Sequence, residues 1–315
     1  MSVRRDAVMI GLNAVVVAVS DDTPRVLVVP GAPGDRDALP FGPFDPVRDR
    51  TLERGLRRWV DERTKLALGY VEQLYTFGDR ARDPHEARGG PRTVSVGYLA
   101  LVRDLGTLAP ARAVWQDWFA YCPWEDRRAG PPPLVAKIIA RLKPWTADAR
   151  APAVREARRE RVAVCFGASG VPWNSQLALE RYELMYEAGL VAEADFDAAR
   201  PVGGPSGFFG KPMALDHRRM LATAIGRVRG KITYRPVVFE LLPPAFTLFH
   251  LQRTVEALAG RRLHKANFRR LVESAGLVDR TGGVQRSTGG RPADEFRFRR
   301  EVLLERPAPG LRIGR

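Results

Sequence analysis

The sequence predicts an α/β domain with a mixed sheet between helices over residues 1–232, followed by a winged helix-turn-helix domain over residues 233–315. In the first part, Val- and Leu-rich runs of strand length alternate with amphipathic stretches. In the second, two apolar helical stripes flank a short turn and precede two strand-like segments around a glycine-rich loop. A chain of 315 residues is also too long for one ordinary core.

The first domain begins with two predicted strands. Residues 7–19 and 25–29 are rich in Val, Ile and Leu, and a polar turn separates them. Apolar residues at helical spacing predict a helix over residues 51–63. Residues 93–102 first alternate between polar and apolar types and then become wholly apolar, which is typical of a strand covered on both faces.

A Pro/Arg-rich segment is predicted to be inserted in this domain. Residues 125–157 are dense in Pro, Arg and Ala and include three consecutive prolines, which favours a surface connection without regular structure. Residues 175–188 and 215–229 follow with helical patterns. We expect both helices to belong to the first domain.

Within the second domain, Pro243-Pro244 precedes the helical segments. Two predicted helices, residues 248–258 and 264–275, end at Gly260 and Gly276. Residues 277–281 and 295–302 are predicted strands, joined by a Gly-rich basic loop. A helix, a turn, a second helix and a two-stranded wing form a winged helix.

The second of these helices carries polar side chains suited to reading DNA. They lie away from Phe268 and comprise Lys265, Asn267, Arg269, Arg270 and Ser274. Arg and Asn pair bidentately with guanine and adenine edges in the major groove, and Lys contacts phosphate. An ordinary solvated helix face is the alternative interpretation.

The predicted wing tip strengthens the DNA interpretation. It carries Arg286, Thr288 and Arg291 among small residues, and a Gly-Arg-Pro tip suits a narrow minor groove. A plain Gly-rich hairpin loop is the alternative. DNA contacts are therefore predicted at the helix and at this tip.

The charge distribution agrees with a nucleic-acid partner. The chain has 51 Lys and Arg against 36 Asp and Glu, a net charge of +15, which attracts polyanions. Residues 233–315 hold 16 Lys and Arg against 8 Asp and Glu, so +8 lies in about a quarter of the chain. A GC-rich genome that prefers Arg is a partial alternative explanation.

The cysteines and the apolar runs predict the compartment. Cys122 and Cys165 stand alone, without metal-ligand spacing, so neither a disulfide framework nor a metal site is predicted. The apolar run over residues 7–19 is too short to cross a bilayer. We expect a cytoplasmic, nucleoid-associated protein without membrane partners.

The helix at residues 51–63 and the residues after it resemble a Nudix box, G-x5-E-x7-R-E-U-x-E-E-x-G-U with U apolar. The matching positions are Arg58, Val60, Glu62 and Leu66. Trp59 and Arg63 stand where two glutamates belong, and Lys65 replaces the second glycine. The spacing from Gly42 is two residues too long, and no Glu occupies the earlier position.

These departures favour binding over hydrolysis. Active Nudix enzymes hold divalent cations on a diphosphate through glutamates on one helix face. Glu62 alone cannot form such a cluster, whereas the guanidinium of Arg63 repels a cation and attracts a phosphate. The box is therefore predicted to be catalytically inactive.

The whole chain resembles the Nudix-related transcriptional regulators of NAD metabolism, in particular the branch that controls quinolinate-dependent NAD synthesis. The segments that carry this resemblance are GYVEQLYTFGD, RTVSVGYLALV, WFAYCPWEDRRAG, LDHRRMLATAIGRVRGKITYRPVVFELLP, LHKANFRRLVESAGLV and GGRPADEFRF. The resemblance implies a Nudix-like effector domain, a winged helix, a homodimer on a palindromic operator, and ATP, NAD or ADP-ribose as effector. It implies no required cofactor.

The candidate effector contacts lie on the box helix and two strands. Arg58, Glu62 and Arg63 are candidates for phosphate and ribose groups, and Phe77 and Tyr98 are candidates for stacking on a base. Packing in the core is the alternative for both aromatics. These residues would make the chain a nucleotide-controlled repressor of NAD biosynthesis genes.

Two rival functions remain open from the sequence. The first is an active Nudix hydrolase of ADP-ribose or a dinucleotide with an accessory nucleic-acid-binding domain. The second is an RNA-binding adaptor, which the helix face and loop tip favour less because they suit duplex grooves.

Overall fold

The computed structural model describes residues 8–32, 36–79, 86, 88–103, 113–202, 209–285 and 292–311. A seven-stranded sheet with the order β3-β2-β1-β6-β5 lies at its centre, with β4 paired to β1 and β7 to β2. The strands are β1 (Val8–Ser20), β2 (Thr23–Ala32), β3 (Arg36–Ala38), β4 (Phe41–Pro43), β5 (Tyr70–Phe77), β6 (Arg92–Leu101) and β7 (Val114–Asp117). Because β1 and β6 run parallel while the other pairs are antiparallel, the predicted mixed sheet is confirmed.

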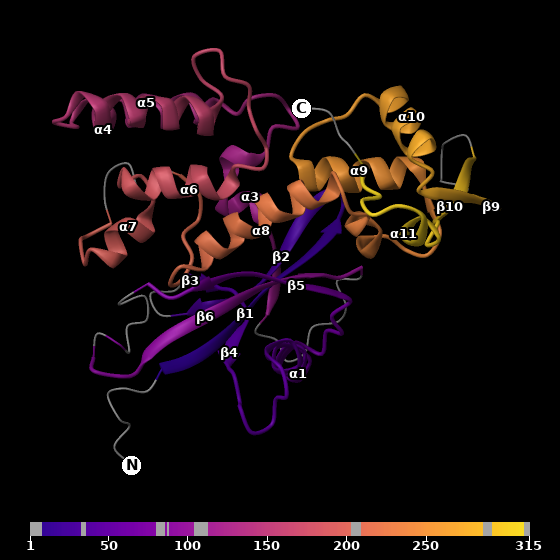
Figure 1. Cartoon of the computed structure of the whole chain (residues 1–315), viewed down its shortest axis with the longest axis horizontal. Helices are drawn as coiled ribbons and strands as arrows, with labels where there is room; N and C mark the ends of the chain where they lie inside the picture. The colour runs from indigo at the N-terminus through magenta and orange to yellow at the C-terminus, as the bar shows by residue number, and fades with distance from the viewer. Residues whose placement is uncertain are drawn as a thin grey trace.

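Helices cover both faces of this sheet (Figure 1). Leu12, Ala14 and Val16 of β1 pack with Leu56 and Val60 of α1 (Leu52–Thr64) on one face. The alternate residues of β1 enter a second core on the other face. Side chains of a strand alternate between faces, so burial on both sides explains why residues 7–19 are apolar throughout.

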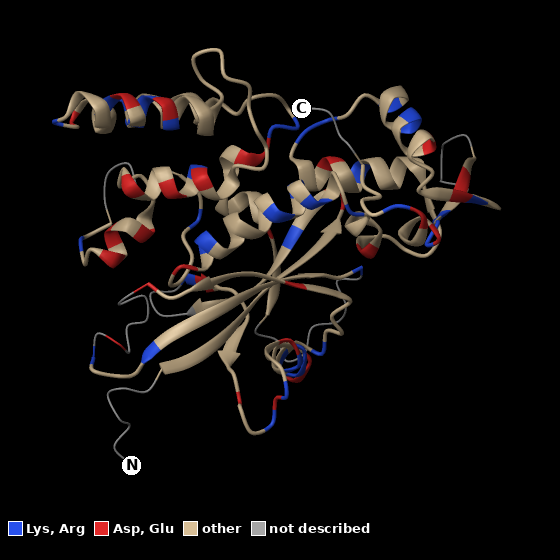
Figure 2. Cartoon of the chain, viewed as in Figure 1, with Lys and Arg blue, Asp and Glu red and all other residues tan. Residues whose placement is uncertain are grey.

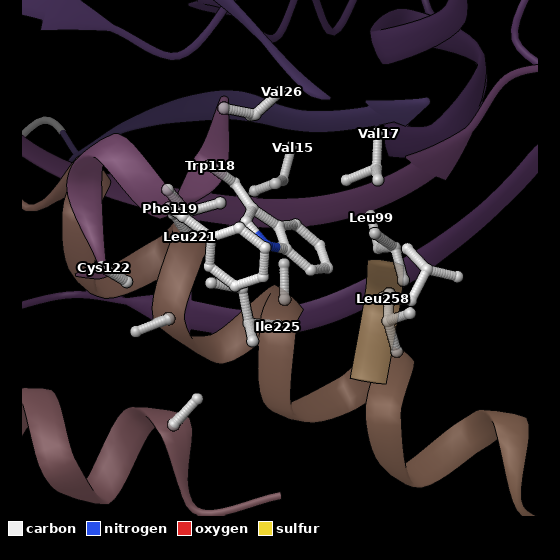
Figure 3. Packing of buried hydrophobic residues seen from close by; sticks show 14 of the residues in the cluster. Val15, Val17, Val26, Leu99, Trp118, Phe119, Cys122, Leu221, Ile225 and Leu258 are labelled. Carbon is white, nitrogen blue, oxygen red and sulfur yellow. The ribbon is translucent and has the colours of Figure 1, made fainter. Parts of the chain in front are cut away.

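The second core surrounds Trp118, which is completely buried. Val15 and Val17 lie around Trp118 of α3 (Trp118–Tyr121), together with Leu221 and Ile225 of α8 (His217–Ile232), as Figure 3 shows. The remaining connections on this side are η1 (Pro123–Glu125), α6 (Ala178–Glu187), α7 (Ala192–Asp197) and η3 (Val237–Leu241).

The prediction of an irregular connection over residues 125–157 is wrong. Two helices occupy most of it, α4 (Pro133–Ala147) and α5 (Pro152–Phe166), and they pack against each other. Each begins with a proline in its first turn, where the missing N–H has no helical partner to lose. The Ala, Arg and Leu residues that follow are strong helix formers.

The C-terminal part has the predicted helix-turn-helix and wing. It comprises β8 (Phe246–Thr247), α9 (Leu248–Ala259), α10 (Lys265–Ala275), β9 (Val278–Gln285), β10 (Ala293–Phe298) and α11 (Val302–Glu305). The strands form a sheet with the order β8-β10-β9. Gly260 and Gly276 end the two helices in the left-handed conformation, as the sequence predicts.

The last predicted strand, residues 295–302, is too long. Phe298 pairs with Val278, the first residue of β9, and one further backbone hydrogen bond, of 2.9 Å, runs from the N–H of Arg299 to Leu277 O. The chain then turns into α11, and Val302 is buried as its first residue. Among the described residues, no helix is long and apolar enough to cross a membrane.

The apolar core continues across the predicted domain boundary at residues 232 and 233. Leu251, Val255 and Leu258 of α9 belong to the same cluster as Val17 and Leu99 of the central sheet. Figure 3 shows Leu258 beside Leu99. The boundary itself stays a prediction, because the two parts share one continuous interior.

Candidate nucleic-acid interface and effector site

Helix α10 is amphipathic and turns a polar face to solvent. Phe268 and Val272 are buried on its inner side. The predicted DNA-reading residues on the helix are all exposed: Lys265, Asn267, Arg269, Arg270 and Ser274. Basic residues mark the outer side of α10 in Figure 2. The structure therefore brings the helical part of the predicted DNA site together on one surface.

Local contacts orient two of these side chains. Arg270 Nη2 donates a 3.4 Å hydrogen bond to Asn267 Oδ1, one turn earlier. Arg269 Nε donates to Glu273 Oε1 over 2.9 Å, an exposed pair that is easily exchanged for a phosphate. The face thus combines Arg and Asn side chains, which read base edges, with cations that contact the backbone.

The wing adjoins this helix. Strands β9 and β10 pair antiparallel, and Arg280 forms a 2.8 Å ion pair with Asp294 across them. The predicted tip contacts Arg286, Thr288 and Arg291 lie outside the described residues. Their role stays a prediction.

A buried carboxylate holds the turn between α9 and α10, which the sequence analysis missed. Glu256 Oε1 accepts hydrogen bonds of 2.9 Å from the backbone N–H of Leu263 and from Gln252 Nε2. Its other oxygen accepts from Arg262 over 2.9 Å and from Arg253 over 3.2 Å. In the sequence, this contact is indicated only by a glutamate that lies four residues before Gly260, the glycine that ends the helix.

On the box helix, Arg58 is held by two carboxylates rather than left free. Its guanidinium makes two 2.8 Å hydrogen bonds to Asp49 and one of 3.0 Å to Glu62. The bond from Arg58 lowers the pKa of Asp49 below its usual value, against the opposing effect of burial. Asp49, which the sequence analysis did not select, anchors the loop before α1 through this pair.

Trp59, at a position where the Nudix box has a glutamate, packs against Gly42 of β4. A Cβ atom added to Gly42 would lie 2.0 Å from Trp59 Nε1, so only glycine fits beneath the indole. The guanidinium of Arg63 lies over the Trp59 ring at 5.6 Å and is exposed. Within the described ranges, no three His, Cys, Asp or Glu side chains converge as metal ligands.

Lys65, which stands where the Nudix box has a glycine, caps the C-terminal end of α1. Lys65 adopts the left-handed conformation, with φ 58° and ψ 22°, and its N–H donates to Asp61 O over 2.9 Å. A glycine would take this conformation without strain. The helix therefore ends in the expected shape despite the substitution.

The two aromatic candidates are not placed for stacking on a common base. Tyr98 is buried in the core beneath α1, and Phe77 is buried in the core on the opposite face of the sheet. Burial raises the pKa of the Tyr98 hydroxyl, with a further contribution from Glu53. The packing alternative for these residues fits the geometry, whereas Glu62 and Arg63 remain on the accessible face of α1.

Comparison with known proteins identifies the second part of the chain. Residues 238–298 match the family model described as the NrtR DNA-binding winged helix domain. This segment is similar to the NrtR winged helix domain. The β8-β10-β9 sheet and the α9–α10 pair of the NrtR-type domain lie within or directly beside the matched residues.

A curated relative supports this NrtR relationship. The "ADPR responsive transcriptional repressor NtrR" of Acinetobacter baylyi is 37% identical over 86 residues, which is 27% of this chain and 34% of the relative. The aligned stretch therefore spans about a third of the relative's length.

Two solved structures share the fold over most of the chain. NrtR from Shewanella oneidensis, crystallised with a 27mer DNA, superposes with a TM-score of 0.55 at 21% identity, covering 93% of this chain and 94% of that one. A MutT/nudix family protein from Enterococcus faecalis superposes with a TM-score of 0.53 at 16% identity, covering 93% and 87%. The predicted order, a Nudix-like domain before an NrtR-type winged helix, is confirmed.

Proposed function

We propose that this protein is a transcriptional repressor of NAD biosynthesis genes that binds duplex operator DNA and responds to a nucleotide. The observation that carries the proposal is the exposed face of α10, which presents Asn267, Arg269 and Arg270 beside the wing of an NrtR-type domain. The winged helix supplies the DNA contacts, and the Nudix-like domain supplies the effector site.

DNA binding is tested by fluorescence anisotropy on duplexes from NAD biosynthesis promoters of the source genome, at two salt concentrations. Arg270→Ala and Asn267→Ala are expected to lose about 1–3 kcal/mol of operator affinity, with relaxed specificity. Arg54→Ala is the matched control, because Arg54 is an exposed arginine of α1, which lies far from α10 (Figure 1). Full affinity in Arg270→Ala, or equal binding to unrelated duplexes, would contradict the proposal.

ADP-ribose is the first effector to test, because the curated relative is described as ADPR responsive. We place its phosphate or ribose groups at Arg63 and Glu62, with Arg58 as a positioning residue held by Asp49. Calorimetric titration compares ADP-ribose with ATP and NAD. Arg63→Ala is expected to weaken the preferred nucleotide about tenfold or more, while Arg54→Ala retains it. Equal nucleotide affinities of the two variants would show that the effector does not bind at the exposed face of α1.

The Nudix-like domain acts as a sensor and not as an enzyme in this proposal. Trp59 covers Gly42, and Arg63 brings a positive charge where a cation would have to bind. Product analysis of ADP-ribose with Mg²⁺ and Mn²⁺ is expected to show no turnover above the buffer control. Turnover that disappears in Glu62→Gln would favour the rival hydrolase function.

The operator is palindromic and the protein binds it as a homodimer in this proposal. A winged-helix dimer recognises two half-sites related by its two-fold axis. Sedimentation of the protein with and without operator duplex is expected to give two chains per duplex. We also place the protein in the cytoplasm at the nucleoid, which fluorescence microscopy of a tagged chain would test.

A further inference from the structure

A small cavity of about 130 Å³ lies where the two parts of the chain meet. Its walls come from Arg127, which lies two residues after η1, from the segment 173–176, and from the ends of α8 and α9. The cavity is on the side of the sheet that α8 and α9 cover, whereas the box helix α1 lies on the other side (Figure 1). It is therefore separate from the proposed effector site.

The charged side chains that line this cavity are all basic. Arg127, Arg229 and Arg261 contribute to its wall, and the described lining residues include no Asp or Glu. Arg229 is 4% exposed. Its guanidinium shares the single carboxylate of Glu125 with that of Arg181, which donates to Glu125 Oε1 over 2.6 Å. One negative charge thus serves two buried cations.

Arg127 is the cation best placed to accept a ligand. Its guanidinium stacks on the Trp173 ring at 4.3 Å, and Arg181 stacks at 3.9 Å on the same ring. No ion pair of Arg127 with a described carboxylate is present, and its backbone N–H donates to Gly260 O over 2.7 Å. Burial and the like charge of Arg181 lower the pKa of Arg127, so an added anion would stabilise its charged form.

The dimensions and donors of the cavity select the kind of anion. A volume of 130 Å³ exceeds that of a few waters and falls short of the 300–1,000 Å³ of pockets that enclose larger ligands. Guanidinium groups match the oxygens of phosphate through paired N–H donors. Asn174 and Gln176 add polar groups to the same wall.

We propose that Arg127 and Arg261, beside the buried charge of Arg229, form a second anion site, which binds inorganic phosphate or the terminal phosphate of a small phosphomonoester. Arg229 contributes mainly its charge, because its guanidinium already donates to Leu258 O, Ser175 O and Glu125. Bound phosphate joins η1 and α8 to the C-terminal end of α9, immediately before the turn into α10. The site would stabilise the arrangement in which α9 is docked. It does not depend on the function proposed above, because it uses none of the box-helix residues.

The test is calorimetric titration of the full chain with inorganic phosphate and, separately, with ribose 5-phosphate, at constant ionic strength. A dissociation constant of about 0.1–1 mM is expected for at least one of them. Arg127→Ala is expected to weaken binding about tenfold or more, and Arg127→Lys less, because it keeps the charge. Arg141→Ala, an exposed arginine of α4, is the matched control and should bind as the unaltered protein does.

The titrations distinguish the two ligands and can overturn the phosphate site. Preference for one ligand distinguishes free phosphate from the ester. Absence of binding, or equal binding by Arg127→Ala and Arg141→Ala, would overturn it. Weakening of DNA binding alone in Arg127→Ala would also overturn it, since the cavity would then serve a DNA phosphate. Circular dichroism confirms that the variants fold, and Arg63→Ala should leave phosphate binding unchanged, which separates this site from the nucleotide effector.

Discussion

Arg253 of α9 donates a 2.8 Å hydrogen bond from Nε to Asp22 Oδ2, in the turn between β1 and β2. Asp22 and Asp21 both adopt left-handed conformations, with φ of 57° and 49°, as a tight type I′ hairpin turn requires. Arg253 also contacts Glu256, which accepts the backbone N–H of Leu263 just before α10. Hydrogen bonds therefore connect the central sheet to the start of α10.

Replacement of Arg253 by alanine should reduce the effect of the effector on operator affinity while lowering the stability of the protein only slightly. The Arg253 and Asp22 side chains are 23% and 42% exposed, so their pair contributes less than about 1 kcal/mol to folding. The buried Glu256 also loses a contact in this variant but keeps its 2.9 Å ion pair with Arg262. We expect operator affinity without effector to change little, and the effector-induced change in affinity to shrink. Anisotropy titrations with and without effector measure both. Arg161→Ala, which breaks an exposed pair with Glu187, is the control; an equal effector response in the two variants would contradict the connection.

Replacement of Glu125 by glutamine should destabilise the protein strongly. The carboxylate is 1% exposed and pairs with Arg181 and Arg229, and these partners lower its pKa although burial acts in the opposite direction. The neutral side chain would leave two buried guanidinium groups without a counter-charge, at a cost of about 3–5 kcal/mol. Urea unfolding measures the loss. Glu187→Gln in an exposed pair should cost less than about 1 kcal/mol, and similar losses would refute this account.

The stabilisation that the Asp49–Arg58 pair gives to the folded protein should be lost in acid. The pKa of Asp49 in the folded protein lies below its unfolded value of 3.8, so its contribution is present above about pH 4 and is lost as pH falls through the folded value. Denaturant unfolding of the unaltered protein and of Asp49→Asn, from neutral pH to pH 3, should show a constant difference at high pH. That difference should narrow below about pH 4. A difference independent of pH would assign the effect of the substitution to packing.

Replacement of Lys65 by glycine should stabilise the protein. Lys65 holds φ at 58°, which costs a residue with a side chain about 1–2 kcal/mol, while glycine loses about 0.5–1 kcal/mol more chain entropy on folding. We expect a net gain of up to about 1 kcal/mol in thermal or urea unfolding. Lys137→Gly, at an exposed position inside α4, should lose about 1 kcal/mol instead. A loss in both variants would show that the Lys65 side chain outweighs its backbone strain.

The elements that the sequence predicts correctly are those with a strong local signal. Gly260 and Gly276 mark the ends of α9 and α10 because a left-handed residue is needed there. The uninterrupted apolar run of β1 reflects burial on both faces of the sheet. The Pro/Arg-rich insertion is predicted wrongly because consecutive prolines usually break regular structure, whereas Pro133 and Pro152 start helices.

The contacts that the sequence does not reveal are long-range pairings between charged side chains. Arg58 and Asp49 meet across a loop, and Arg253 and Asp22 meet across 231 positions. Neither pair has the i to i+4 spacing that reveals an ion pair on a helix. Tyr98 and Phe77 were candidates for stacking by residue type alone, and only the position of each in the sheet shows that a separate core encloses it.

The core shared by α9 and the central sheet limits how this protein can be dissected and how it can move. Leu251, Val255 and Leu258 are completely enclosed by residues from both parts. Cutting the chain near residue 232 would expose an apolar surface on each fragment, so separately expressed halves should aggregate instead of folding side by side. The winged helix is thus not a tethered module that swivels on a linker. In the proposed homodimer, a change in the spacing between the two winged helices would require whole chains to shift against each other.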